Sequence, residues 1–273
     1  MKYLLSASDH REELLRFFPP SFAQEVRNLP MSSNGDKSSL FSIDRWSQPI
    51  HYSWFSDIMR EYPPKVQACF LGVLTHQQAE GLQKLLSLTE KRKNLIPFLR
   101  PFLTHILHRT IADPDLLAEQ LLPPSPFNNL LKLQRKQLIH LVDFLGLHDL
   151  SADLRQVVDK DLLSRIHQAL SPDQLHFLQY CSKQPLKWVS PKLGLLAWDG
   201  SKKQLNYLLH SRGLIRLAKA IFPEHPSFKW HLMHHFDTGR AKIIQKEFYR
   251  KQDSSLLSYF KNQVLHIAKR YQL

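Results

Sequence analysis

The strongest fold signal in the chain is the run Ser171-Pro172-Asp173-Gln174. A serine here can cap a helix N-terminus, and proline is favoured at the first helical position because its missing N–H needs no partner there. The glutamine three residues after the cap completes a capping box, in which each end residue bonds the other's backbone N–H. The run therefore predicts a helix that continues through Tyr180.

Further helix signals recur along the rest of the chain. Apolar residues repeat at helical spacing over 129–145 and again over 162–170. Cap residues followed by capping-box or proline signals predict three more helices, which begin at Asp9, Thr75 and Asp113 and end at Phe18, Leu88 and Leu122.

Strand signals are scarce by comparison. Asp199-Gly200 is a dipeptide typical of hairpin turns, but the flanking residues 193–198 and 204–209 do not alternate cleanly between apolar and polar. We therefore predict an all-α protein, an irregular multi-helix bundle with at most a minor hairpin.

Positive charge is concentrated in the C-terminal third. The 273 residues include 37 Lys and Arg against 24 Asp and Glu, a net charge of +13. Residues 1–170 hold 20 against 18, a balance of +2, and residues 171–273 hold 17 against 6, a balance of +11. We divide the chain into a near-neutral helical region, 1–170, and a basic helical region, 171–273, which continuous apolar patterning joins in one core. The asymmetry indicates a face for an acidic partner, which can be nucleic acid, anionic lipid or protein.

The sequence carries features of a cytoplasmic protein. Cys69 and Cys181 are isolated from each other and from any partner at metal-ligand spacing, so they suggest no disulfide framework. The apolar run at the N-terminus is too short for a signal peptide, and no stretch reaches the length of a bilayer-spanning helix. We therefore expect a cytoplasmic location.

Fifteen histidines raise the question of a metal site. His231 and His235 are four residues apart, but a zincin needs glutamate directly after the first histidine, where Leu232 stands. His105 and His108 are three apart and lack a supporting carboxylate or cysteine. We therefore expect no metal site and no cofactor.

Asp237-Thr238-Gly239 matches the triplet of aspartic proteases. That chemistry needs two triplets on facing loops so that two carboxylates share one proton, and this chain has one. We interpret Asp237 as the N-cap of a helix over 242–249. No other catalytic set was found, and we expect a non-enzymatic protein.

The residues around Gly213 carry a basic stripe. The glycine can break one helix and begin another, and Arg212, Arg216 and Lys219 follow each other at helical spacing. Because guanidinium groups are rarely buried without a carboxylate, and few acids lie nearby in sequence, we expect Arg212, Arg216 and Arg240 to be partly exposed.

A second unit follows over 225–240. Helical spacing places Phe228, Leu232 and Phe236 in the core, with an aromatic and histidine group nearer the edge, as is typical of interfaces. Our candidate partner-binding residues from the two units are Arg212, Arg216, Trp230, His231, His234 and Arg240.

Together these two units resemble the K protein of the type III secretion sorting platform, the SctK/YscK family. The likeness covers about the last quarter of the chain. It depends on Leu208-Leu209-His210-Ser211-Arg212-Gly213-Leu214-Ile215-Arg216-Leu217-Ala218, then His225-Pro226-Ser227, Trp230-His231 and Asp237-Thr238-Gly239-Arg240.

This resemblance implies a mainly α, non-enzymatic adaptor at the cytoplasmic face of the secretion apparatus. Its partners would be the cytoplasmic domain of the inner-membrane ring protein, SctD-like, and the C-ring-like pod protein, SctQ-like. The alternative is a basic helical nucleic-acid-binding protein, with a helix-turn-helix around Gly213. We favour the adaptor because residues 214–220 offer few short polar side chains to read base edges.

Overall fold

The computed structural model describes residues 12, 15–16, 20–27, 46–96, 99–184, 193, 195, 198–250 and 253–271. Within these ranges every regular element is a helix and no strand occurs, so the predicted all-α class is confirmed. The chain forms two compact units, residues 1–47 and 48–273. In the first, α3 spans Pro20–Arg27, and Arg27 pairs with Glu12 at 2.9 Å. The helix predicted over 9–18 lies largely outside the described residues.

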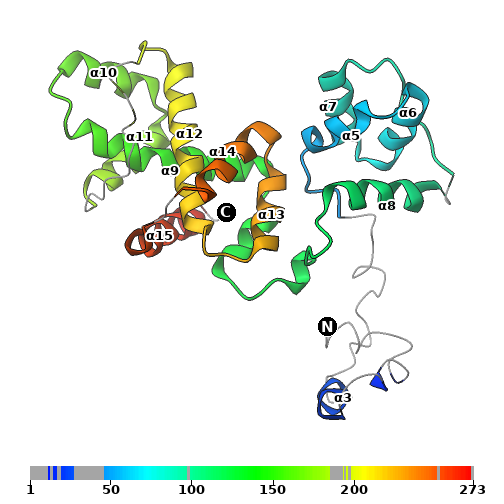
Figure 1. The fold of residues 1–273 in the computed structure, drawn as a ribbon. Coiled ribbons are helices and arrows are strands. Elements are labelled where there is room, and N and C mark those ends of the chain that lie inside the picture. Colours follow the sequence, from blue (N-terminus) through cyan, green and yellow to red (C-terminus); the bar gives the residue numbers. More distant parts are fainter. Residues whose placement is uncertain are drawn as a thin grey trace. The chain divides into compact units, whose positions relative to one another are not determined.

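The second unit contains the remaining elements (Figure 1). Its N-terminal helices are η2 (Tyr52–Phe55), α5 (Ser56–Arg60), α6 (Pro64–Val73), α7 (His76–Leu86) and α8 (Leu99–Ile111). Its C-terminal helices are η3 (Glu119–Leu121), η4 (Pro126–Lys132), α9 (Arg135–Leu154), α10 (Lys160–Ala169), α11 (Pro172–Ser182), α12 (Lys202–Ile221), α13 (Pro226–His235), α14 (Thr238–Phe248) and α15 (Ser254–Arg270).

The capping boxes predicted at Thr75 and Ser171 are confirmed, while the one predicted at Asp9 lies outside the described residues. Ser171 Oγ accepts from the Gln174 backbone N–H at 3.3 Å, and the Ser171 N–H donates to the glutamine side chain at 2.9 Å. Thr75 and Gln78 make the same pair of bonds at 3.3 and 3.0 Å. α7 ends two residues earlier than predicted, because Ser87 takes a left-handed conformation at its C-cap.

The helix predicted between Asp113 and Leu122 is wrong, since only the short turn η3 forms there. The segment keeps only short-range turn bonds of its own, such as Leu116 N–H to the Asp113 carbonyl, and the backbone of Leu117 bonds to α13. The Leu117 N–H donates to Ser227 Oγ at 3.1 Å, and the Leu117 carbonyl lies 2.7 Å from His231 Nε2.

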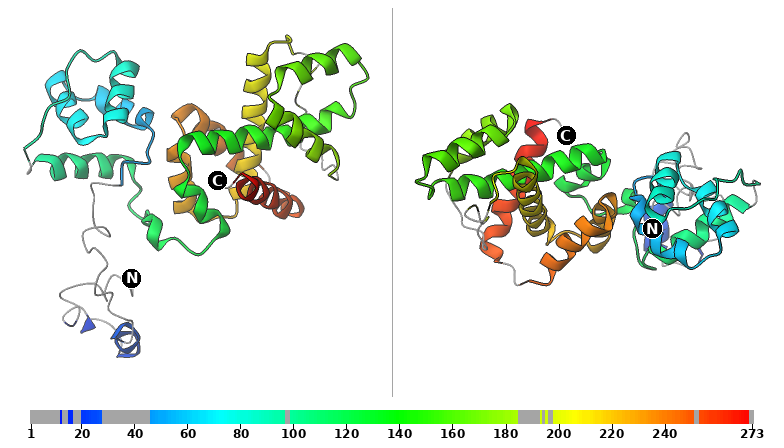
Figure 2. Two further views of the ribbon diagram at one scale, coloured as in Figure 1. Left: turned by 180° about the vertical axis from the view of Figure 1, so that it is seen from behind. Right: turned by 90° about the horizontal axis from the view of Figure 1, so that it is seen from above.

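The helix break predicted at Gly213 is also wrong, because α12 continues from Lys202 to Ile221. Figures 1 and 2 show α12 crossing α9. At the crossing, a Cβ atom on Gly213 would overlap the Val142 carbonyl, and one on Gly146 would overlap the Leu209 carbonyl. The two glycines therefore allow backbone-to-backbone packing rather than a turn.

The minor hairpin that the sequence allowed at Asp199-Gly200 does not form in the described residues. Gly200 has a φ of +86°, and the turn leads into α12, whose N-cap Ser201 accepts from the Gln204 N–H at 3.2 Å. Residues 202–209 are therefore helical, while 194, 196 and 197 on the other flank lie outside the described residues.

One apolar core joins the C-terminal helices across position 170. Its buried side chains extend from Leu122 to Ile267 and include members of α9, α11, α12, α13 and α15. The predicted core positions Phe228, Leu232 and Phe236 are each exposed by 1% or less.

Candidate partner-binding residues and the polar network at α13 and α14

Arg212 and Arg216 lie inside the molecule, so their expected exposure is wrong. Only 6% of Arg212 and 1% of Arg216 is exposed. Arg212 Nε donates to Asp149 Oδ2 at 2.7 Å, and Arg216 donates to the other oxygen of the same carboxylate. Arg216 also donates to Gln263 Oε1 at 2.7 Å. The two arginines therefore hold α12 to α9 and α15, and a partner cannot reach them in the folded chain.

Arg240 is partly exposed, as expected, with 38% of its side chain accessible. It pairs with Asp237, and Asp237 accepts the Arg240 backbone N–H at 3.0 Å, which confirms this aspartate as the N-cap of α14. Burial by itself raises the pKa of Asp237, but the hydrogen bonds and charge of Arg240 bring this pKa below its ordinary value.

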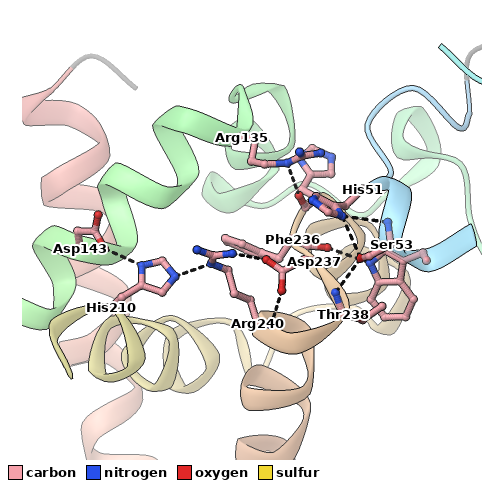
Figure 3. A network of polar contacts seen from close by, with 11 residues as sticks. His51, Ser53, Arg135, Asp143, His210, Phe236, Asp237, Thr238 and Arg240 are labelled. Carbon is pink, nitrogen blue, oxygen red and sulfur yellow. Dashed lines mark hydrogen bonds and ion pairs between the residues drawn. The ribbon is translucent and has the colours of Figure 1, made fainter. Parts of the chain in front are cut away.

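His210 extends this pair toward α9 (Figure 3). Arg240 Nε lies 2.7 Å from His210 Nε2, and His210 Nδ1 lies 2.6 Å from Asp143 Oδ1. Because the arginine can only donate, His210 Nε2 must accept. The ring proton is then on Nδ1 and is donated to Asp143.

Trp230 and His234 were expected nearer the edge, but both are buried, with 9% and 5% exposed. Their rings stack at 3.7 Å, and Trp54 stacks on His234 at 3.9 Å. His231 is part-buried against η3, with its Nδ1 3.8 Å from Glu119. These three candidate residues therefore contact other parts of the same chain.

The start of η2 bonds directly to the corner between α13 and α14. The His51 N–H donates to the His234 carbonyl at 2.8 Å, and the Trp54 indole N–H donates to the Phe236 carbonyl at 2.9 Å. Ser53 Oγ accepts the Thr238 backbone N–H at 3.0 Å. We call the residues labelled in Figure 3 the polar network: His51, Ser53, Arg135, Asp143, His210, Phe236, Asp237, Thr238 and Arg240. Sequence reasoning missed its N-terminal members, which lie more than 180 positions from their partners.

Three histidines in and beside the polar network, His51, His234 and His235, are held neutral. Burial is the main cause that lowers the pKa values of His51, His234 and His235 to about 4, and the charge of Arg135 acts in the same direction on His51 and His235. Arg135 Nε also donates to the His235 carbonyl at 3.3 Å. Neutral rings at pH 7 serve here as packing and hydrogen-bonding groups.

The contacts of the polar network hold distant parts of the same chain together. Across the described ranges, no three His, Cys, Asp or Glu side chains come together in a way that could hold a metal ion. Among the helices of the same ranges, none is both long and apolar enough to cross a bilayer. Comparisons with protein-family models, curated proteins and solved structures gave no match.

Proposed function

We propose that the chain is a non-enzymatic, cytoplasmic adaptor of a type III secretion sorting platform. In this role it would link the cytoplasmic domain of an SctD-like inner-membrane ring protein to an SctQ-like pod protein. The all-α fold is compatible with this role. The sequence block that carries the resemblance forms α12, α13 and the start of α14, which pack together in one core.

The observation that carries the proposal is the outer face of α14. Lys242, Lys246 and Arg250 are exposed, and 83% of Tyr249 is accessible. The opposite face packs inward through Ala241 and Ile244, which are exposed by 2% or less. A helix held by its apolar side and presenting cations beside an aromatic ring suits an acidic protein partner.

The exposed side of α14 is a different surface from most of the partner-binding residues predicted from the sequence. Arg212 and Arg216 are enclosed, and Trp230 and His234 are covered by residues of η2 and α13. Arg240 keeps a part-exposed guanidinium at the start of α14. Its guanidinium bonds to His210 of α12 and to Asp237, so it does not belong to the outer face. The proposed partner surface is therefore Lys242 and Lys246 of α14 together with Tyr249 and Arg250, which directly follow the helix, and we call it the α14 face.

Nucleic-acid binding is the competing function, favoured by the net charge of +13. Its most specific support was a helix-turn-helix around Gly213, and that glycine lies inside the unbroken helix α12. What remains is general attraction to phosphate, which falls steeply with salt.

The test uses the purified full chain with two purified proteins from the same genome, the SctD-like cytoplasmic domain and the SctQ-like pod protein. We expect a complex at about 0.15 M salt that weakens as added salt screens the lysines of the α14 face. The variant Lys242→Glu/Lys246→Glu should weaken binding about tenfold or more with an unchanged melting temperature.

The matched control is Lys202→Glu/Lys203→Glu, which makes the same charge change at two exposed residues of α12. This control should keep its affinity within about twofold. If the chain binds neither protein, the adaptor proposal is overturned. Binding of a random DNA duplex that is lost steeply with salt, with no protein complex, supports the nucleic-acid alternative.

A further inference from the structure

Positive charge is also concentrated in one short segment of the near-neutral region. Residues 84–109 hold six Lys and Arg against one Glu, a balance of +5. An anionic surface is attracted by such a local excess over about a Debye length, which is about 8 Å at physiological salt. All six cations are exposed: Lys84, Lys91, Arg92, Lys93, Arg100 and Arg109.

The C-terminus of α6 gathers several of these cations at one place. Arg92 Nη2 and Arg100 Nη2 both donate to the Gly72 carbonyl, at 3.4 and 3.3 Å. The backbone N–H of the residue after Arg92 donates to the Ala68 carbonyl at 3.2 Å. Carbonyl groups at a helix C-terminus attract cations. Residues 91–93 therefore lie beside the first turn of α8, which contains Arg100.

Two large apolar side chains are exposed at the same end of α8. Ile96 is 65% exposed just before the helix, and its carbonyl accepts the Leu99 N–H at 3.0 Å. Phe102 is 57% exposed in the first turn. Large apolar side chains that are exposed close to one another mark interaction sites.

The opposite face of α8 fixes the helix in the molecule. Figures 1 and 2 show α8 running along one side of α5, α6 and α7. The outer face carries Phe102, His105 and Arg109, which follow each other at spacings of three and four residues and are exposed. The buried side chains of the helix are Leu103, Thr104 and Leu107.

A membrane surface with anionic lipids would use both kinds of exposed residue. Each cation near such a surface adds attraction to the lipid headgroups. Large apolar side chains can enter the boundary between headgroups and acyl chains, as those of interfacial helices do. The backbone of a nucleic-acid duplex would contact the cations but leave Ile96 and Phe102 in water.

We propose that the first turn of α8 and the segment before it bind the surface of membranes that contain anionic lipids. The headgroup phosphates are attracted by Lys91, Lys93 and Arg100, while Ile96 and Phe102 enter the boundary below the headgroups. We call these five residues the α8 site. This site is independent of the adaptor role, because none of its residues belongs to the α14 face.

The test is co-sedimentation of the full chain with two kinds of vesicle. One kind contains phosphatidylcholine and phosphatidylglycerol, and the other contains phosphatidylcholine alone. We expect the chain to bind the anionic vesicles about tenfold or more tightly than the neutral ones, since only the anionic headgroups attract the cations. Added salt should weaken this binding.

Two lysine pairs assign the binding to the α8 site. Lys91→Gln/Lys93→Gln removes two exposed charges and should weaken binding to anionic vesicles about tenfold or more. The matched control Lys242→Gln/Lys246→Gln removes the same charge from the α14 face and should bind within about twofold of the wild type. Because the adaptor test depends on that second pair, the two proposals can fail separately.

The apolar contribution is tested by two single changes. Ile96→Gln and Phe102→Gln should each weaken binding to anionic vesicles about fivefold or more. Ile96→Gln should keep the melting temperature, because the residue lies outside the helix and most of its side chain is exposed. The control Tyr249→Gln, at a residue that is 83% exposed, should bind as the wild type does.

Three results would overturn the proposal: no binding to anionic vesicles, equal affinity for the two kinds of vesicle, or equal losses from the two lysine pairs. If the vesicles are not bound but Ile96→Gln weakens a complex with the SctD-like or SctQ-like protein, the α8 site is a protein contact and the membrane site is withdrawn.

Discussion

Asp149 accepts hydrogen bonds from two arginines of α12 in a place that solvent hardly reaches. Its side chain is 6% exposed, and those of Arg212 and Arg216 are 7% and 1% exposed. Gln263 and the ring of Phe260, whose centre is 5.6 Å from the Arg216 guanidinium, add further stabilisation. A buried charge cluster of this kind is destabilised strongly when a single member is removed.

The first prediction at the residue scale is therefore the change Asp149→Asn, which keeps the shape and removes the charge. It should lower the free energy of unfolding by about 3–5 kcal/mol, since two buried guanidinium groups lose the charge of the carboxylate that they share. Urea unfolding followed by circular dichroism measures the effect. Asp57→Asn removes a carboxylate that is 87% exposed and should change stability by about 0.5 kcal/mol or less. Equal losses for the two variants would contradict this role of Asp149.

Acid should weaken the fold through the buried histidines. Their folded pKa values of about 4 lie below the ordinary value of about 6.5. The unfolded chain therefore takes up protons between pH 6.5 and 4 that the folded chain does not, so stability is complete above pH 6.5 and is lost as the pH falls.

The measurement is the urea midpoint between pH 7.5 and 5, where ordinary carboxylates hardly titrate. His148, whose pKa burial lowers to about 3, contributes a slope of the same sign. Each well-buried histidine adds a slope of about 1.4 kcal/mol per pH unit below pH 6.5, and His51 adds less because it is less enclosed. The changes His234→Gln and His235→Gln should flatten the profile. A midpoint that stays constant to pH 5 would show that these rings are protonated as easily in the fold as in water.

At the scale of elements, the closest packing in the C-terminal core is the crossing of α9 and α12. Glycine is the least favourable helix residue after proline, so alanine at position 213 would raise helix propensity by about 1 kcal/mol. The added Cβ would overlap a main-chain carbonyl of α9, which cannot turn away as a side chain does.

The prediction is that Gly213→Ala lowers the unfolding free energy by about 1–3 kcal/mol despite its better propensity. Asn206→Ala, at an exposed position of the same helix, is the control and should be more stable by about 0.5 kcal/mol. Thermal and urea unfolding give both values. If Gly213→Ala is more stable than the wild type, α9 and α12 can move apart at their crossing without a loss of stability.

The sequence predicted correctly those elements whose hydrogen bonds are local, and failed where distant residues decide the structure. Both capping boxes were predictable because all their bonds lie within three residues. The helix predicted over 113–122 did not form, and in its middle both backbone groups of Leu117 bond to α13, more than 100 residues away. The break predicted at Gly213 failed for a similar reason, since the demand for glycine comes from α9.

Interactions between residues far apart in the sequence also limited the prediction of the candidate site. The C-terminal charge excess correctly indicated exposed cations, and α14 carries several of them. The exposure of Arg212 was predicted wrongly because its counter-ion, Asp149, lies 63 residues earlier in the near-neutral region. The expected edge position of Trp230 failed because η2 supplies the ring that closes the stack with His234.

At the scale of the second unit, Trp54 is the main link between the N-terminal helices and the corner of α13 and α14. Its indole N–H bonds to the Phe236 carbonyl at 2.9 Å, and its ring stacks on His234. The backbone N–H of His51 and the hydroxyl oxygen of Ser53 also bond to this corner, but both belong to one turn of chain. Removal of the indole should therefore loosen residues 48–111 without unfolding the core of α9–α15.

The prediction is that Trp54→Ala lowers the free energy of unfolding of the N-terminal helices by about 2–3 kcal/mol, less than for a fully buried tryptophan. Hydrogen exchange of the full chain reads each part separately. Amides of α6 and α7 should exchange faster, while those of α9 and α12 should keep their protection, because their contacts do not pass through Trp54. Tyr249→Ala removes an aromatic ring that is 83% exposed and should leave both sets unchanged. If α9 and α12 lose protection together with α6 and α7, the second unit unfolds as one cooperative block, and Trp54 is part of its common core rather than a link between two sets of helices.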